Sequence, residues 1–132
     1  MDQEFLVTEQ IDAGAQFLEE FGKKFPVRAA FWMRPTEEGQ WYLHVVSDQI
    51  NQQNIDAAYR EVSRLDEQMR NLYFDRFRVK LIAADDPSAQ AALDIHRRYP
   101  GRVPTRFCGP SFGGIRVEGV YIYPSSVATP SP

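Results

Sequence analysis

Two segments with alternating apolar residues, joined by a short turn, constrain the fold of this 132-residue chain most strongly. Residues 27–34 and 40–46 each place apolar side chains at every second position, which is the pattern of a β-strand with one buried face. Between them, residues 35–39 read Pro-Thr-Glu-Glu-Gly, a composition and length typical of a hairpin connection. The apolar sets are Val27, Ala29, Phe31 and Met33 in the first segment and Trp41, Leu43 and Val45 in the second. We therefore expect a β-hairpin.

Three other segments have apolar residues at helical spacing and predict amphipathic helices. The first covers residues 9–21, and the second follows the polar run 49–54. The third begins with Asp86 as its cap and Pro87 at its first helical position, and it ends before Pro100. The apolar faces are Ile11, Ala15, Leu18 and Phe21 in the first, Ile55, Ala58, Val62, Leu65, Met69 and Leu72 in the second, and Ala91, Ala92, Ile95 and Tyr99 in the third.

The remaining patterned segments predict strands with different places in the sheet. Residues 77–83 alternate, starting from Phe77. Residues 103–108 are confined to an edge because prolines at 104 and 110 lack the N–H that a central strand needs, whereas residues 115–123 are apolar on both faces and fit an interior strand. The order α-β-β-α-β-α-β-β predicts an α+β fold, a two-layer sandwich with three helices and a mostly antiparallel sheet of four or five strands.

The length and composition fit one globular domain over residues 1–123. Hydrophobic residues make up 43% of the chain and charged residues 25%, so the body has enough apolar surface to fold. Residues 124–132 are rich in Pro and Ser and are expected to form a disordered tail. The acidic start of the chain and the lack of any apolar run near 20 residues favour a cytoplasmic protein without a membrane segment.

The net charge of −3 conceals an asymmetry along the chain. Residues 1–94 contain ten basic and seventeen acidic side chains, whereas residues 95–132 contain five arginines and one glutamate. Arginine suits phosphate and carboxylate groups, and neighbouring aromatic rings can stack on bases, so this segment predicts an anionic ligand or nucleic acid as partner. The anion-binding candidates are Arg97, Arg98, Arg102, Arg106 and Arg116. The alternative is that they pair with acids of the chain, such as Asp75, Asp85 and Asp94.

Catalysis is the competing functional class. Cys108, the single cysteine, lies next to glycine and is a weak candidate for a nucleophile, with His44 and His96 as the available imidazole bases. The alternative for Cys108 is a small buried hydrophobe. A metal-dependent nuclease would need acids such as Asp48, Asp85 and Asp86, but the chain has no metal-binding signature and no cofactor is predicted. The enzyme alternatives are thus a Cys108-dependent hydrolase or transferase, or such a nuclease.

Two aromatic residues leave the oligomeric state open. Trp32 and Tyr42 lie on the less apolar faces of the predicted hairpin strands. Either helices of the same chain cover them, or a second copy does so in a homodimer.

Three segments carry a resemblance: Phe-Pro-Val-Arg-Ala-Ala-Phe-Trp at 25–32, Trp-Tyr-Leu-His-Val-Val-Ser at 41–47 and Val-Glu-Gly-Val-Tyr-Ile-Tyr at 117–123. With them the chain resembles small uncharacterised bacterial proteins. The resemblance implies a stand-alone bacterial domain and supplies no activity or site residues. The residues themselves favour a small binding or regulatory module that contacts an anionic partner through its Arg-rich carboxyl-terminal segment.

Overall fold

The computed structural model describes residues 5–101 and 103–124, and these form an α+β fold, as predicted. Its helices and strands occur along the chain in nearly the expected order. They are α1 (Thr8–Phe21), β1 (Ala29–Pro35), β2 (Tyr42–Val46), α2 (Ile55–Met69), the 3-10 helix η1 (Arg76–Arg78), β3 (Val79–Ile82), α3 (Pro87–Arg98), β4 (Thr105–Phe107), β5 (Ser111–Phe112) and β6 (Ile115–Ile122). The short strand β5 was not predicted, and the expected tail lies outside the described residues except for Pro124.

The strands of this part of the chain form one mostly antiparallel sheet with the order β3-β2-β1-β6-β4, and β5 pairs with β6. Only β2 and β3 are parallel, because a crossover containing α2 connects them. The predicted hairpin is confirmed by the antiparallel pairing of β1 with β2. The predicted edge position of β4 and the interior position of β6 are confirmed as well.

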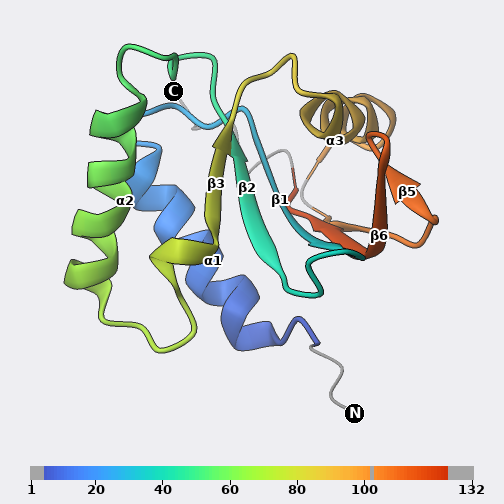
Figure 1. Ribbon diagram of the computed structural model, residues 1–132, viewed down its shortest axis with the longest axis horizontal. Helices are drawn as coiled ribbons and strands as arrows, with labels where there is room; N and C mark the ends of the chain where they lie inside the picture. Colours follow the sequence, from blue (N-terminus) through green and yellow to red (C-terminus); the bar gives the residue numbers. More distant parts are fainter. Residues whose placement is uncertain (1–4, 102, 125–132) are drawn as a thin grey trace.

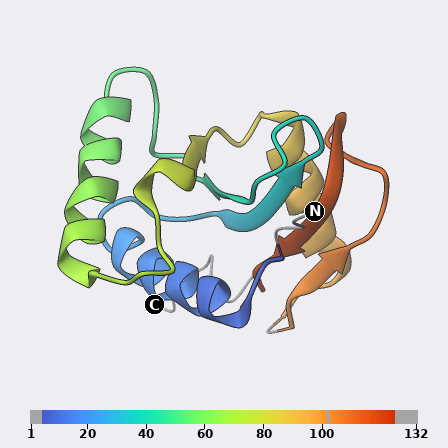
Figure 2. The ribbon, with the colours of Figure 1, turned by 60° about the horizontal axis from the view of Figure 1, so that its bottom comes forward.

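Both faces of the central strand β1 are buried, and helices cover both. Ala30 and Trp32 pack with α1 and α2, whereas Phe31 and Met33 pack with α3. Figure 1 shows α1 and α2 on one side of the central strands and α3 on the other, and Figure 2 shows the same separation from a second direction. The predicted two-layer sandwich corresponds to the sheet with α1 and α2 on one face. Helix α3 adds a further layer on the opposite face of the sheet, here called the α3 face.

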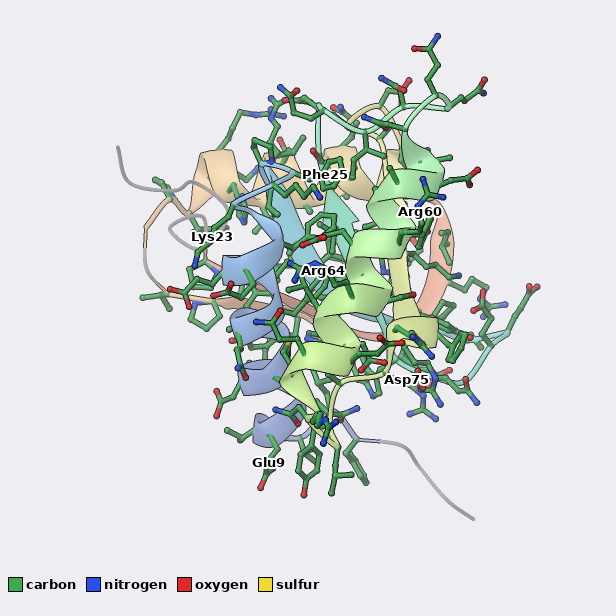
Figure 3. The ribbon with its side chains drawn as sticks, turned by 90° about the vertical axis from the view of Figure 1, so that its left-hand side faces the viewer. Glu9, Lys23, Phe25, Arg60, Arg64 and Asp75 are labelled. Carbon is green, nitrogen blue, oxygen red and sulfur yellow. The ribbon has the colours of Figure 1, made fainter. Side chains whose placement is uncertain are left out.

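The two helices of the first layer lie side by side, with charged groups along the seam between them (Figure 3). Glu61 of α2 is buried there and accepts hydrogen bonds from Arg64 at 2.7 and 2.9 Å. Lys24, just after α1, approaches the same carboxylate at 3.8 Å. A buried carboxylate needs such partners, so this contact helps to fix the pairing of α1 with α2.

Some predicted apolar positions lie outside the core. Helix α2 ends at Met69 because Arg70 adopts a left-handed conformation with φ of 50°, and Leu72 is therefore 97% exposed instead of extending the helical face. Phe77 belongs to η1 instead of β3 and is exposed, as is Tyr99 after the end of α3. Among the residues that the structure describes, no helix is long and apolar enough to cross a membrane.

Trp32 and Tyr42, which the sequence placed on the less apolar faces of the two strands, lie on opposite faces of the sheet. The actual register pairs Trp32 with Leu43 and Met33 with Tyr42, so Trp32 faces α1 and Tyr42 lies on the α3 face. The indole is 3% exposed and is thus covered within the chain. Of the two outcomes that the sequence left open, coverage by a helix applies to Trp32.

A buried hydroxyl joins the sheet to α1. Trp32 Nε1 donates a hydrogen bond of 2.9 Å to Tyr123 Oη, which donates one of 2.6 Å to the Ile11 carbonyl oxygen. Burial raises the pKa of Tyr123 well above its usual value, so the hydroxyl keeps its proton. Gly14 faces this group, and a Cβ atom at Gly14 would overlap Tyr123 Oη.

We predict that Tyr123→Phe lowers the free energy of unfolding by about 1 to 3 kcal/mol, because Trp32 Nε1 loses its buried acceptor. Tyr99→Phe, at an exposed tyrosine, should change it by less than about 0.5 kcal/mol. Glycine to alanine usually stabilises a helix by about 1 kcal/mol, but Gly14→Ala should destabilise the protein, and less so in the Tyr123→Phe background. Urea unfolding of the four variants measures these effects, and a stabilising Gly14→Ala would contradict the described contact.

Candidate functional site

The structure separates the predicted arginines instead of gathering them in one patch. Arg97 and Arg98, at the end of α3, both pair with Asp94, at 3.3 and 3.2 Å. Arg106 on β4 stacks over the ring of Tyr121, 5.0 Å from its centroid, on the sheet face opposite α3. Arg102 lies outside the described residues. Pairing with Asp94, one of the alternatives drawn from the sequence, thus applies to two of the five.

Cys108 is exposed and not a buried hydrophobe. His44 is on β2, three strand spacings from β4, which corresponds to about 14 Å. His96 Nε2 lies 3.0 Å from the carbonyl oxygen of Tyr123. If the pairing of β4 with β6 is continued by one residue, Cys108 lies opposite Gly119, and Gly119 is about 13 Å from Tyr123 along the strand. Neither imidazole is therefore within hydrogen-bonding reach of the thiol in this arrangement.

The acids considered for a metal site have structural partners. Asp48 pairs with Arg28 at 3.3 Å. Asp86 caps α3 by accepting hydrogen bonds from the backbone N–H and the hydroxyl of Ser88, at 2.9 and 2.7 Å. Within residues 5–101 and 103–124, no three His, Cys, Asp or Glu side chains form a group that could hold a metal ion.

Arg116 lies instead at a cavity of about 510 Å³ on the α3 face of the sheet. This cavity, here called the His44 pocket, lies between the β1–β2 turn, strands β2 and β3 and the β5–β6 hairpin. Met33 and His44 line it from the sheet, and its charged lining residues are Glu37, Glu38, Lys80 and Arg116. Its volume falls within the usual range of roughly 300 to 1,000 Å³ for small-molecule sites.

Two turns bring the walls of the His44 pocket together. Gly113 and Gly114 have φ angles of 60° and 84° and form the two-residue turn of the β5–β6 hairpin, a conformation that favours glycine. Gly113 packs so closely on Ser88 at the start of α3 that a Cβ atom would clash with the helix backbone. The backbone N–H of Thr36 donates a 2.9 Å hydrogen bond to the Arg116 carbonyl oxygen and ties the β1–β2 turn to β6.

His44 is the buried polar side chain of this pocket. It is 4% exposed and stacks on Phe31, its partner on β1, with 4.9 Å between ring centroids and 3° between ring planes. Its Nδ1 atom lies 3.2 Å from the Tyr42 carbonyl oxygen. Because a carbonyl only accepts hydrogen bonds, the proton of the neutral ring belongs on Nδ1, and Nε2 carries a lone pair.

The Nε2 atom of this pocket-lining histidine has an unused lone pair. It has no hydrogen-bond partner among the described residues, where the only polar contact of the His44 ring is the one to Tyr42. In the same part of the chain, every fully buried side-chain nitrogen or oxygen has a hydrogen-bond partner. Because Nε2 has none, it is not fully buried. His44 therefore offers the pocket an unused hydrogen-bond acceptor.

Burial lowers the pKa of His44 from 6.5 to about 4. The hydrogen bond with the Tyr42 carbonyl oxygen opposes this effect of burial and raises the pKa. Smaller effects come from the cation Lys80, which lowers the pKa, and from the carboxylates of Asp86 and Glu38, which raise it. The imidazole is thus neutral at pH 7 and available as an acceptor.

Two cations accompany the imidazole. Lys80 is the direct partner of His44 on β3, and its ammonium lies 3.4 Å from the Glu38 carboxylate and 4.3 Å from the centroid of the Tyr42 ring. Arg116 is exposed, and its guanidinium has no acidic partner within 4 Å among the described residues. The residues that line the pocket therefore include Lys80, which pairs with the exposed Glu38, Arg116, which has no acidic partner in the described part of the chain, and the neutral acceptor His44.

No protein-family model, curated protein or solved structure matches this chain. The functional proposal therefore rests on the geometry of the chain itself. The sequence pointed to Arg116, but it suggested His44 only as an available imidazole base for Cys108 and gave no reason to single out Lys80. Local patterns give no signal for their proximity, because residues 36, 44, 80 and 116 meet only through the long-range sheet pairings.

We predict that acidification from pH 7 to pH 4 destabilises the protein by about 3 kcal/mol through His44 alone. Between the unfolded pKa near 6.5 and the folded pKa near 4, the unfolded state binds more protons, so the free energy of unfolding falls as the pH falls. Other charged groups also lie around the ring or the pocket, namely Lys80, Asp86, Glu37, Glu38 and Arg116. They are the same in the wild type and in the His44 variant that is compared with it.

Urea unfolding of the wild type and of His44→Phe from pH 7 to pH 4 measures this contribution as the difference between the two slopes. The variant keeps an aromatic ring against Phe31 but cannot titrate. Equal slopes would contradict a buried neutral imidazole.

Proposed function

We propose that this protein is a small binding module that takes an anionic small molecule into the His44 pocket. The observation that carries the proposal is a cavity of ligand size that the cationic residues Lys80 and Arg116 both line, with no acidic partner for Arg116 in the described part of the chain. Arginine presents several N–H donors in a plane and binds carboxylate and phosphate groups in a bidentate manner.

Lys80 supplies the second cation. Its ion pair with Glu38 is partly exposed, with side chains 40% and 43% accessible, and pairs of this kind contribute at most about 1 kcal/mol to stability. An incoming anion can therefore replace Glu38 as the partner of Lys80 at small cost. A ligand that bridges Lys80 and Arg116 would gain contacts from both walls of the pocket.

A small anion suits this site better than nucleic acid. Glu37 and Glu38 lie at the pocket and would repel an extended phosphate backbone. Arg97 and Arg98 share Asp94, and Arg106 lies on the other face of the sheet, so the described arginines do not form a continuous basic track. We infer that the partner is a compact molecule with one or two anionic groups.

We predict that Arg116→Gln weakens the binding of small anions by roughly tenfold, the effect of losing one charge-assisted hydrogen bond. Arg97→Gln, also exposed but located at the end of α3, is the matched control and should bind like the wild type. Titration of ¹⁵N-labelled protein with malate and with glycerol 3-phosphate at low ionic strength yields both the affinities and the residues that respond.

Amide shifts that concentrate at residues 36–38, 44, 80 and 114–116 would support the proposal. No binding, or equal binding by the wild type and Arg116→Gln, would refute it. A short single-stranded DNA that binds through Arg97 and Arg106, with no effect of Arg116→Gln, would identify the predicted nucleic-acid partner instead.

A further inference from the structure

We propose that the ligand of the His44 pocket carries a hydroxyl group beside its anionic group, and that His44 is the residue that selects it. This inference rests on the proposed function and adds a chemical class, small hydroxylated organic anions. The hydroxyl would donate a hydrogen bond to His44 Nε2 while Arg116 and Lys80 hold the anionic group.

His44 has a hydrogen-bond acceptor that no described residue uses. His44 is 96% removed from solvent and lines this pocket, yet its Nε2 atom has no hydrogen-bond partner among the described residues and is not sealed inside the protein. A ligand that covers this polar atom without donating a hydrogen bond removes it from water and so loses binding free energy. A ligand that places a donor against the atom avoids this loss. The pocket therefore discriminates against anions that offer only apolar atoms at this point.

The sheet holds the His44 ring in one orientation. The ring is held by its stacking on Phe31 and by the contact of Nδ1 with the Tyr42 carbonyl oxygen. Both are neighbours on the sheet, so the direction of the Nε2 lone pair is fixed before a ligand arrives. A preorganised acceptor selects a donor in one position without an entropic cost of ordering the side chain.

The charge around the His44 acceptor favours a neutral donor. Lys80 is the cross-strand partner of His44, and Arg116 lines the same cavity, so an ammonium donor at Nε2 would meet repulsion from both cations. A hydroxyl is a neutral donor and avoids this repulsion. The pKa of His44 near 4 keeps the ring neutral and accepting at physiological pH, in agreement with this assignment.

Matched ligand pairs test the inference with the protein as it is. Malate and succinate differ by one hydroxyl, as do glycerol 3-phosphate and 3-hydroxypropyl phosphate, and the two pairs distinguish a carboxylate from a phosphate as the anionic group. We predict that in at least one pair the member with the additional hydroxyl binds roughly three- to tenfold more tightly, the effect of one hydrogen bond.

Two variants separate selection from anion binding. His44→Phe, which retains an aromatic ring against Phe31, should bring the affinity ratio of the pair close to one. Arg116→Gln should weaken both members of the pair and leave their ratio unchanged. In the wild type, the ¹⁵N resonance of His44 Nε2 should move upfield with the preferred member only, a readout that does not depend on whether a variant folds.

The outcomes distinguish the two levels of the proposal. If no member of either pair binds the wild type, the proposed function and this inference both fail. If the two members bind equally in both pairs, if His44→Phe keeps the preference, or if the Nε2 resonance does not respond, the inference is overturned while the anion-binding function stands.

Discussion

The burial of strand β1 on both faces is the constraint on which the rest of this structure depends. Residues Ala29–Met33 are almost completely inaccessible, so the alternating side chains of one strand belong to two separate cores. One face requires α1 and α2, and the other requires α3 and Phe112. The hydroxyl of Tyr123 adds a polar link from Trp32 on this strand to the carbonyl oxygen of Ile11 in α1.

The His44 pocket follows from the same strand. Phe31 has His44 as its neighbour on one side and Ile122 on the other, and His44 is followed by Lys80 in the same row across the sheet. The register of β1 with β6 shifts between Arg34 and Pro35, where the turn leaves the sheet and Thr36 contacts Arg116. Apolar packing covers the Phe31 end of this row, while the β3 end remains open between two turns. The acceptor and the two cations are therefore positioned by the sheet and not by a flexible loop.

Local patterns predicted much of the fold, because alternation, helical spacing and the Asp86-Pro87 start report directly on backbone conformation. They failed where a single backbone angle or a long-range pairing decides the outcome. Arg70 ends α2 before Leu72, and the hairpin register sends Trp32 and Tyr42 to opposite faces. The pair Gly113-Gly114 is typical of a two-residue hairpin turn, but the interpretation of this segment relied on its arginines instead. Arg116 was identified from composition, but its meeting with His44 and Lys80 depends on three strand pairings that no local pattern contains.

The central claim is that His44 presents a neutral imidazole with its lone pair on Nε2 to the pocket. Long-range ¹H–¹⁵N correlation spectra of the ring nitrogens test it most directly, because protonated and unprotonated nitrogens have well separated ¹⁵N shifts. The account predicts a protonated Nδ1 and an unprotonated Nε2 at pH 7, a pattern that persists until the pH approaches about 4. A ring that becomes an imidazolium near pH 6.5, or one that carries its proton on Nε2, would contradict the account.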